Sequence, residues 1–135
     1  EIKRYESANG EIILTDDEFK LGVRMKMLPS YGQLNSINKV VIDSSTLIEK
    51  TSFTNINYLQ VYTLMTDLYF TDCIFENIEF IELRVTNVIF FVDCVFKMCK
   101  IDCINRSELK SKIIFKNCIF ENNHIDSDGV ELITI

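Results

Sequence analysis

Three stretches of the sequence repeat one pattern, and this repetition constrains the fold more than any other feature. They are FTDCIF at 70–75, FVDCVF at 91–96 and FKNCIF at 115–120. Each copy reads Phe, any residue, acid or amide, Cys, any residue (here aliphatic), Phe. The copies begin 21 and 24 residues apart, at positions 70, 91 and 115. Self-similarity at such a spacing is typical of a solenoid, in which each repeat forms one coil stacked on the next.

A shorter period runs inside these copies. Apolar residues recur at every fifth position, at Phe70, Phe75, Phe80, Val85 and Phe90. The step then resumes at Phe91, Phe96, Ile101, Phe115, Phe120, Ile125, Val130 and Ile135. A step of five fits neither an α-helix nor a free strand, whose periods are about 3.6 and 2. It predicts a chain that turns a corner every five residues and forms a square coil, with the one extra residue of the 21-residue spacing accommodated as a bulge at Phe90–Phe91.

The two periods together predict which residues stack in coils that lie about 4.8 Å apart. We expect inner columns of Phe70, Phe91 and Phe115, of Phe75, Phe96 and Phe120, and between them of Cys73, Cys94 and Cys118. On the outside, the same register aligns Glu76, Lys97 and Glu121, and this alternation of charge stabilises neighbouring coils slightly.

We therefore expect an all-β protein, a parallel β-solenoid of about four coils over residues 38–135. Its first coil is degenerate and passes through Phe53, Tyr58 and Leu68. The polar stretch 103–112 lacks the step of five and is interpreted as a loop inserted between two coils. Residues 1–37 do not repeat, but they contain the turn signal ANG and the alternating GVRMKML, so they are expected to form an N-terminal cap or hairpin.

Charge and composition exclude several function classes. The net charge of −6 argues against nucleic acid as a ligand, because such binding needs clustered Lys and Arg, and it favours a basic partner or none. No apolar run approaches the roughly 20 residues that span a bilayer, so we expect no membrane insertion by this segment. The chain starts at Glu1 without a signal-like stretch, which we interpret as an excised or processed piece.

The five cysteines cannot all pair within one chain. Those of the repeated pattern are interpreted as small, buried wall residues. Cys99 and Cys103 are close enough in sequence for a local bridge, which stays open as an alternative. A metal site is not expected, because the single histidine, His124, is remote from that pair and no Cys-x-x-Cys exists. No cofactor motif is present.

Two constellations raise the question of catalysis. Asp72, Asp93 and Asn117 occupy equivalent places in successive copies, and stacked carboxylates act as acid and base in polysaccharide-cleaving β-helices. The simpler interpretation is an outward polar column at a corner, where such side chains bond the local backbone. His124 is interpreted as a surface histidine, and DSDG at 126–129 as a turn rather than a calcium loop. We therefore predict no enzyme and no catalytic residue, but a protein-binding domain that offers its flat faces and an open strand edge to a protein partner.

One glycosylation sequon, NRS at 105–107, lies in the expected loop. Asn105 is therefore the candidate for N-glycan attachment if the protein enters the secretory pathway.

The step of five, with Phe at its centre and Cys, Thr or Ile two residues before, resembles the pentapeptide-repeat family. The resemblance covers roughly residues 51–101 and 113–135, and it implies a right-handed quadrilateral β-helix. The family pattern places Asp or Asn between Ala and a central Leu. Here DCIFENIEF keeps the centre but has Ile74 and Glu79 in the middle position, which makes the chain divergent.

Within that family, YFTDCIFENIEF followed by FVDCVFKMC looks most like the luminal loop of the synaptic vesicle glycoprotein family. That resemblance implies a glycosylated luminal or extracellular domain of a membrane protein, which serves as a receptor for protein toxins partly through an open strand edge. The coil at 113–125 and the polar insertion depart from it. Two alternatives stay open: a bacterial pentapeptide-repeat or effector β-helix that binds a cytosolic or host protein, and a carbohydrate-active β-helix.

Overall fold

The repeats form extended strands, as shown by a computed structural model that describes residues 2–6, 11–16, 32–43, 47–63 and 67–135. One sheet contains the long strands β3 (Gly32–Asp43), β5 (Thr51–Tyr62), β7 (Ile74–Val85) and β9 (Val95–Asn105), followed by β11 (Ile119–Glu121) and β12 (His124–Asp128). The other contains β4 (Leu47–Glu49), β6 (Leu68–Thr71), β8 (Val88–Val92), β10 (Ser111–Lys116) and β13 (Val130–Thr134). We call them the long-strand sheet and the short-strand sheet.

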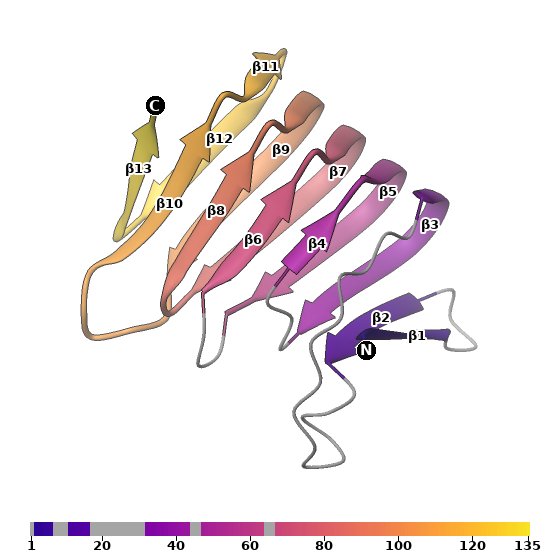
Figure 1. Ribbon diagram of the computed structural model, residues 1–135, viewed down its shortest axis with the longest axis horizontal. Helices are drawn as coiled ribbons and strands as arrows, with labels where there is room; N and C mark the ends of the chain where they lie inside the picture. Colours follow the sequence, from indigo (N-terminus) through magenta and orange to yellow (C-terminus); the bar gives the residue numbers. More distant parts are fainter. Residues whose placement is uncertain (1, 7–10, 17–31, 44–46, 64–66) are drawn as a thin grey trace.

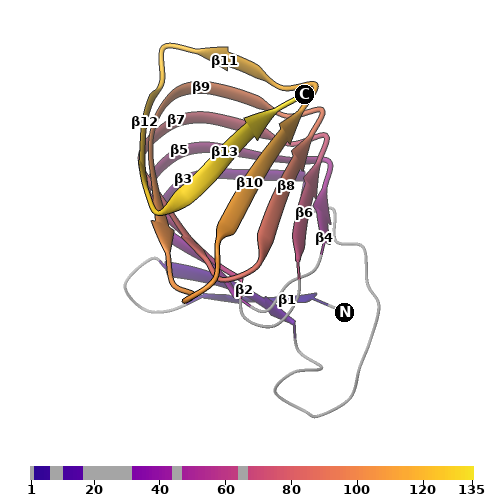
Figure 2. The same cartoon turned by 90° about the vertical axis from the view of Figure 1, so that its left-hand side faces the viewer.

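The chain alternates between the two sheets, so each coil contributes to both (Figures 1 and 2). The short-strand sheet has the order β13-β10-β8-β6-β4, and the long-strand sheet follows β3-β5-β7-β9-β11, with β12 also paired to β9. All pairings between successive coils are parallel. The expected all-β parallel solenoid of about four coils is thus confirmed.

A hairpin extends the long-strand sheet at its N-terminal end. Strand β2 (Glu11–Asp16) pairs with β3 in parallel, and β1 (Ile2–Glu6) pairs with β2 antiparallel. The expected turn at Asn9–Gly10 and the expected strand at 22–28 lie outside the described residues. Strand β3, which pairs with β5, begins at Gly32, ahead of the expected start of the solenoid at residue 38.

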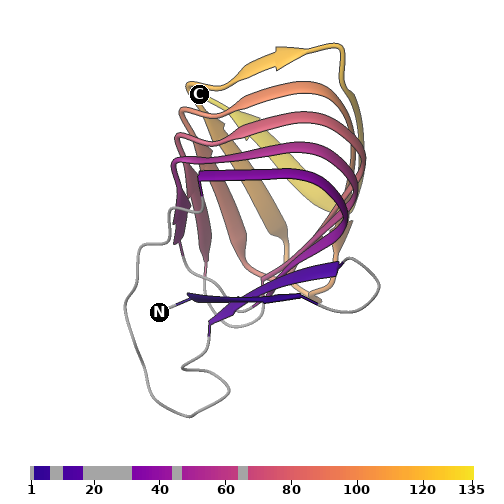
Figure 3. The same cartoon turned by 90° about the vertical axis from the view of Figure 1, so that its right-hand side faces the viewer.

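Two columns of residues with left-handed backbone form corners of the coil. One contains Lys50, Asp72, Asp93 and Asn117, and the other contains Ser36, Asn55, Asn77, Met98 and Asn122. Asp72 and Asn77 of one coil, with φ of 56° and 53°, are five residues apart. Asn and Asp tolerate this conformation better than other side chains, which explains their recurrence here. Part of the step of five is therefore the distance in sequence between two left-handed corners. Figure 3 shows a bend in each long strand.

The step of five does not continue around the whole coil. Beyond the second corner, β7 runs without another left-handed residue to Val85, and its side chains alternate between the two faces. Phe80 and Phe90 were expected inside, but both are partly exposed. The extra residue lies between Ile78 and Ile81 of β7, where the register against β9 shifts. The bulge predicted at Phe90–Phe91 is wrong, because Phe90 and Phe91 pair regularly with Tyr69 and Phe70.

The expected loop at 103–112 is shorter than predicted. Strand β9 continues to Asn105 and β10 begins at Ser111, so only residues 106–110 connect the two sheets here. Cys103 and Ser111 are both fully buried. The neighbouring residues in the sequence are mostly polar, so nothing in the sequence indicated that Cys103 and Ser111 belong to strands.

Candidate functional site

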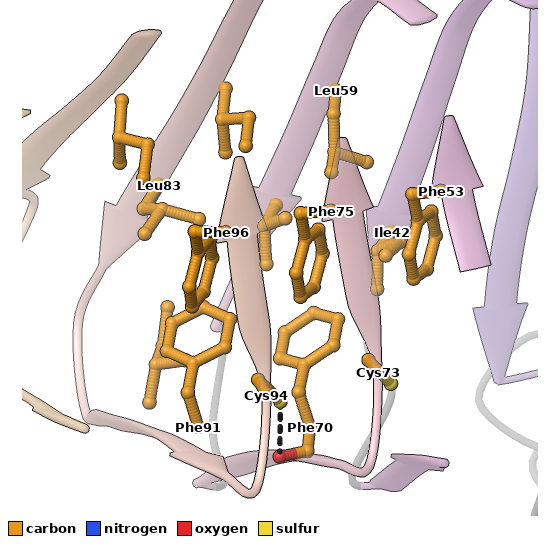
Figure 4. Close-up of a cluster of buried hydrophobic side chains, with 14 of the residues drawn as sticks. Ile42, Phe53, Leu59, Phe70, Cys73, Phe75, Leu83, Phe91, Cys94 and Phe96 are labelled. Carbon is orange, nitrogen blue, oxygen red and sulfur yellow. Dashed lines mark hydrogen bonds between the residues drawn. The ribbon is translucent and has the colours of Figure 1, made fainter. Parts of the chain in front are cut away.

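The repeated Phe and Cys residues line the interior of the solenoid (Figure 4). The rings stack between coils at centroid distances of 4.9 Å for Phe70–Phe91, 5.3 Å for Phe91–Phe115, 4.7 Å for Phe75–Phe96 and 5.2 Å for Phe96–Phe120. Rings of the two columns meet edge to face. Phe53 extends the second column by stacking on Phe75. At the C-terminal end Phe120 is 37% exposed, because no further coil of the described chain covers it.

The cysteines of the repeats lie between these columns. Their thiols donate hydrogen bonds to main-chain carbonyls of the preceding coil, Cys73 to Ile48, Cys94 to Phe70 and Cys118 to Phe91, at 3.6, 3.4 and 3.2 Å. Cys73 and Cys94 are fully buried, whereas Cys118 is half-buried in the last coil. These residues close the coil wall and present no open nucleophile.

Cys99 and Cys103 are also free and buried, inside β9. Residues four apart in an extended strand have Cα atoms about 13 Å apart, and a disulfide needs less than about 7 Å. The alternative of a local bridge therefore fails. Burial raises the pKa of the Cys103 thiol to about 12, which keeps it protonated and unreactive at neutral pH.

Asp72, Asp93 and Asn117 lie at a corner and are exposed. The Asn117 side-chain amide donates to Asp93 Oδ1 at 2.7 Å. The structure therefore places this column where the simpler interpretation expected it, with left-handed backbone and water-facing side chains.

His124 and the DSDG stretch belong to the last coil. His124 Nε2 lies 3.1 Å from Asp126 Oδ2, and both side chains are exposed. Gly129, with φ of +72°, makes the left-handed turn between β12 and β13, a conformation that favours glycine. Among the described residues, no group of three or more His, Cys, Asp or Glu side chains could hold a metal ion.

Asn105 ends β9 and organises the 106–110 connection. Its Oδ1 accepts hydrogen bonds from the Ser107 amide (2.8 Å) and the Ser111 hydroxyl (2.6 Å), and its Nδ2 donates to the Leu109 carbonyl (3.2 Å). Because one Nδ2 hydrogen bonds to Leu109, a glycan on Asn105 would have to replace the other hydrogen. Gly129 packs closely against Asn105, since a Cβ at Gly129 would lie only 3.1 Å from Asn105 Cβ.

A polar network on the outer face of the long-strand sheet escaped the sequence reasoning. Glu82 is 7% exposed, and it accepts hydrogen bonds from the Tyr58 hydroxyl, Gln60 Nε2 (3.0 Å) and Arg84 Nε (2.9 Å). Arg84 also donates to the Tyr62 hydroxyl at 3.2 Å, and its guanidinium lies 5.0 Å from that ring centre. The sequence indicates this network only through the alternation of polar or aromatic with aliphatic residues in YLQVY of one coil and FIELRV of the next.

The network shifts the pKa of its members. Burial alone would raise the pKa of Glu82, but the hydrogen bonds from Tyr58, Arg84 and Gln60 lower it below its usual range. Burial and the bond to Glu82 raise the pKa of Tyr58 to about 12. An ionised Glu82 bound to a neutral tyrosine is a stable arrangement, and neither group is poised to exchange a proton near neutral pH.

The C-terminal coil has no further coil of the described chain beyond it. Among the described strands, β11 and β12 pair only with β9, and β13 pairs only with β10. Several apolar side chains are exposed there: Ile119 (55%), Phe120 (37%), Leu132 (38%) and Ile135 (77%). The outward charge ladder expected below this end is present, since Lys97 pairs in register with Glu76 and Glu121, and its Nζ lies 4.0 Å from Glu121.

Comparisons with protein-family models, with curated proteins and with solved structures found no match. No helix long and apolar enough to cross a membrane occurs in the described part of the chain. The fold and its surfaces are therefore the basis for any functional conclusion.

Proposed function

We propose that this chain is a non-catalytic protein-binding domain whose open C-terminal edge accepts an extended segment of a partner. The parallel β-solenoid fold is compatible with such a role. The observation that carries the proposal is the outer edge of β13, which pairs with no strand of the described residues and lies next to exposed Leu132 and Ile135. Partners that add a strand bond to the backbone edge and gain specificity from alternate side chains.

The direction of the backbone groups in β13 supports this. Ile135 donates its N–H to Phe115 and accepts from Asn117, so its backbone faces β10. Because backbone groups alternate along a strand, Leu132 and Thr134 direct theirs away from β10. These residues offer the donors and acceptors that a further strand would use.

The charge of the last coil indicates the kind of partner. Residues 117–135 contain no Lys or Arg, but they contain Glu121, Asp126, Asp128 and Glu131. A segment that alternates basic with β-branched residues would match both the acidic surface and the strand edge.

Peptide binding tests this proposal. The probe is a labelled peptide of about eight residues that alternates Lys with Val, and fluorescence anisotropy reports its binding. We expect saturable binding that weakens with salt, and much weaker binding of two controls, a Glu-for-Lys peptide and a backbone N-methylated peptide. Equal binding of the N-methylated peptide would contradict strand addition.

A matched pair of variants places the site. Thr134→Pro removes an edge N–H that no described strand uses, whereas Thr134→Ala keeps it. We expect the first to lower peptide affinity at least tenfold and the second to leave it nearly unchanged. If both variants bind like the wild type, the peptide does not use this edge.

For the compartment, we propose a luminal or extracellular location with a glycan on Asn105, in line with the resemblance to the glycoprotein family. The half-buried Asn105 retains one Nδ2 hydrogen outside its loop bonds, which supports attachment. Secretion from eukaryotic cells followed by glycosidase treatment should reduce the mass, and Asn105→Gln should abolish this reduction. A secreted protein without a glycan would contradict the proposal.

A second candidate is a bacterial or effector-type solenoid that binds a protein in a reducing compartment. It is favoured by the five unpaired cysteines, because secreted proteins usually pair theirs. Thiol counting in denaturant on protein from its native source separates the two. Five free thiols support the reducing compartment, and any disulfide would count against it. The carbohydrate-active alternative requires depolymerising activity that is lost in Asp72→Asn, Asp93→Asn protein.

A further inference from the structure

An apolar stripe crosses the whole outer face of the short-strand sheet. The strand register aligns Leu47, Tyr69, Phe90, Ile114 and Ile133, one residue from each strand. Tyr69 is 40% exposed and the others are partly exposed. The Tyr69 and Phe90 rings stack flat at 4.4 Å and 4°. Val88 and Val92, also partly exposed, widen the stripe at the central strand β8.

Charged residues flank this stripe with a polarity along the solenoid. Glu49 and Asp67 lie at its N-terminal half, and the exposed Lys112 and Lys116 lie at its C-terminal half. Glu131 follows Lys112 one strand further out. The central strand β8 lies between the strands next to the acids and the strand that carries the lysines, and it contributes only apolar residues to this face.

We propose that this face binds a second copy of the chain, antiparallel across a two-fold axis near Phe90. Contiguous exposed apolar surface of this kind marks an interaction site. The surface is distinct from the C-terminal edge, so this inference does not depend on strand addition.

The charges select the second copy and its direction. With β8 at the centre of the sheet order, a two-fold axis across the stripe places β10 of one copy opposite β6 of the other. Lys112 then faces the row of Asp67, and this contact occurs twice by symmetry. A parallel arrangement would place Lys112 opposite Lys116, which repels. Phe90, Val88 and Val92 meet their own counterparts at the axis.

The size of the face predicts a weak dimer. Five strands about 4.8 Å apart and about five residues wide cover roughly 400 Å² in projection. A standard interface covers about 800 Å² on each partner. We therefore expect a concentration-dependent dimer with a dissociation constant in the micromolar range.

Sedimentation equilibrium of the whole chain tests the proposal. We expect reversible dimerisation, abolished by Phe90→Glu and retained in Phe80→Glu, the matched change of a partly exposed Phe on the other sheet. Thr134→Pro should also retain it, which separates this face from the strand edge. Circular dichroism confirms that each variant is folded. A wild-type chain that stays monomeric up to millimolar concentration would overturn the proposal.

A charge exchange tests the antiparallel direction. Lys112→Glu should weaken the dimer at least tenfold, and adding Asp67→Lys should restore most of the affinity. Asp67 also accepts the Val88 amide at 3.1 Å, so the unfolding midpoint of each variant is measured alongside. If Lys112→Glu alone dimerises as well as the wild type, or the folded double variant does not recover, the antiparallel arrangement is wrong.

Discussion

The two parts of each coil are stabilised in different ways. Around the left-handed corners, residues 70–78 build the interior from stacked Phe rings and buried thiols. In the flat part, residues 79–85, the outer face carries the network around Glu82. The stability of the corner region depends on apolar burial and on the shape of the packed rings. The stability of the flat region also depends on hydrogen bonds to the nearly buried Glu82 carboxylate. Changes in the two regions should therefore differ in size and in pH dependence.

The largest effect is expected in the Phe column. Phe96→Ala removes a ring that stacks on both Phe75 and Phe120, and it should lower the free energy of unfolding by about 3–5 kcal/mol. Phe80→Ala, on the outer face, should cost less than half as much. Urea denaturation measures both. Equal costs would mean that the corner interior is no more important than the flat face.

The Glu82 network should rank second. Glu82→Ala leaves the Tyr58, Gln60 and Arg84 donors without their acceptor, at an expected cost of about 1–3 kcal/mol. Glu76→Ala, on the exposed ladder, should change stability by less than about 0.5 kcal/mol. Because the pKa of Glu82 is lowered on folding, its contribution is complete above the unfolded pKa and disappears as the pH falls through the folded value. An acid limb identical in wild type and Glu82→Ala would argue against this.

Tyr58 provides the alkaline counterpart. Tyr58→Phe should cost about 1 kcal/mol at neutral pH, through the lost hydrogen bond. Its folded pKa of about 12 lies above the unfolded value of about 10. Stability from this group is therefore complete below pH about 10 and falls as the pH rises toward 12. The variant should lack that loss in denaturation curves recorded across this range; a parallel decline would assign it to other groups.

The smallest effect is expected at a corner. Met98 has φ of 53° in a column whose neighbouring members are Asn77 and Asn122. Met98→Asn or Met98→Gly should raise the free energy of unfolding by about 0.5–1 kcal/mol, because both residues accept left-handed backbone more readily. Met98→Ala is the control and should bring no gain. A destabilised Met98→Gly protein would show that the exposed Met side chain makes contacts that outweigh the strain.

The repeats predicted the corner region because each corner carries a local signal. Every copy has an Asp or Asn at the first corner, between two Phe residues. The stacking of Phe70 on Phe91 and of Phe75 on Phe96 could therefore be predicted from the sequence. The same step gave a wrong expectation beyond the second corner. Phe80 lies in the bulge between Ile78 and Ile81, and Phe90 lies in the regular strand β8, whose alternate residues face outward.

The Glu82 network could not be foreseen for a different reason. Its members come from neighbouring coils, and their meeting depends on a register that spans Tyr58 to Phe80 and Gln60 to Glu82. Glu82 and Arg84 read as ordinary exposed residues in the sequence. Only the three-dimensional arrangement shows that Glu82 is nearly buried and that three side chains donate hydrogen bonds to its carboxylate.

The two kinds of connection between the sheets differ in their tolerance of length. Every corner between a short strand and the following long strand spans one or two residues, as at 50, 72–73, 93–94 and 117–118. The opposite connections that the structure describes in full vary, from one residue at 129 and two at 86–87 to five at 106–110. An evolving chain, or a designer, can therefore lengthen one rim of this molecule freely, whereas the other rim admits almost no insertion without losing the stacking of its rings.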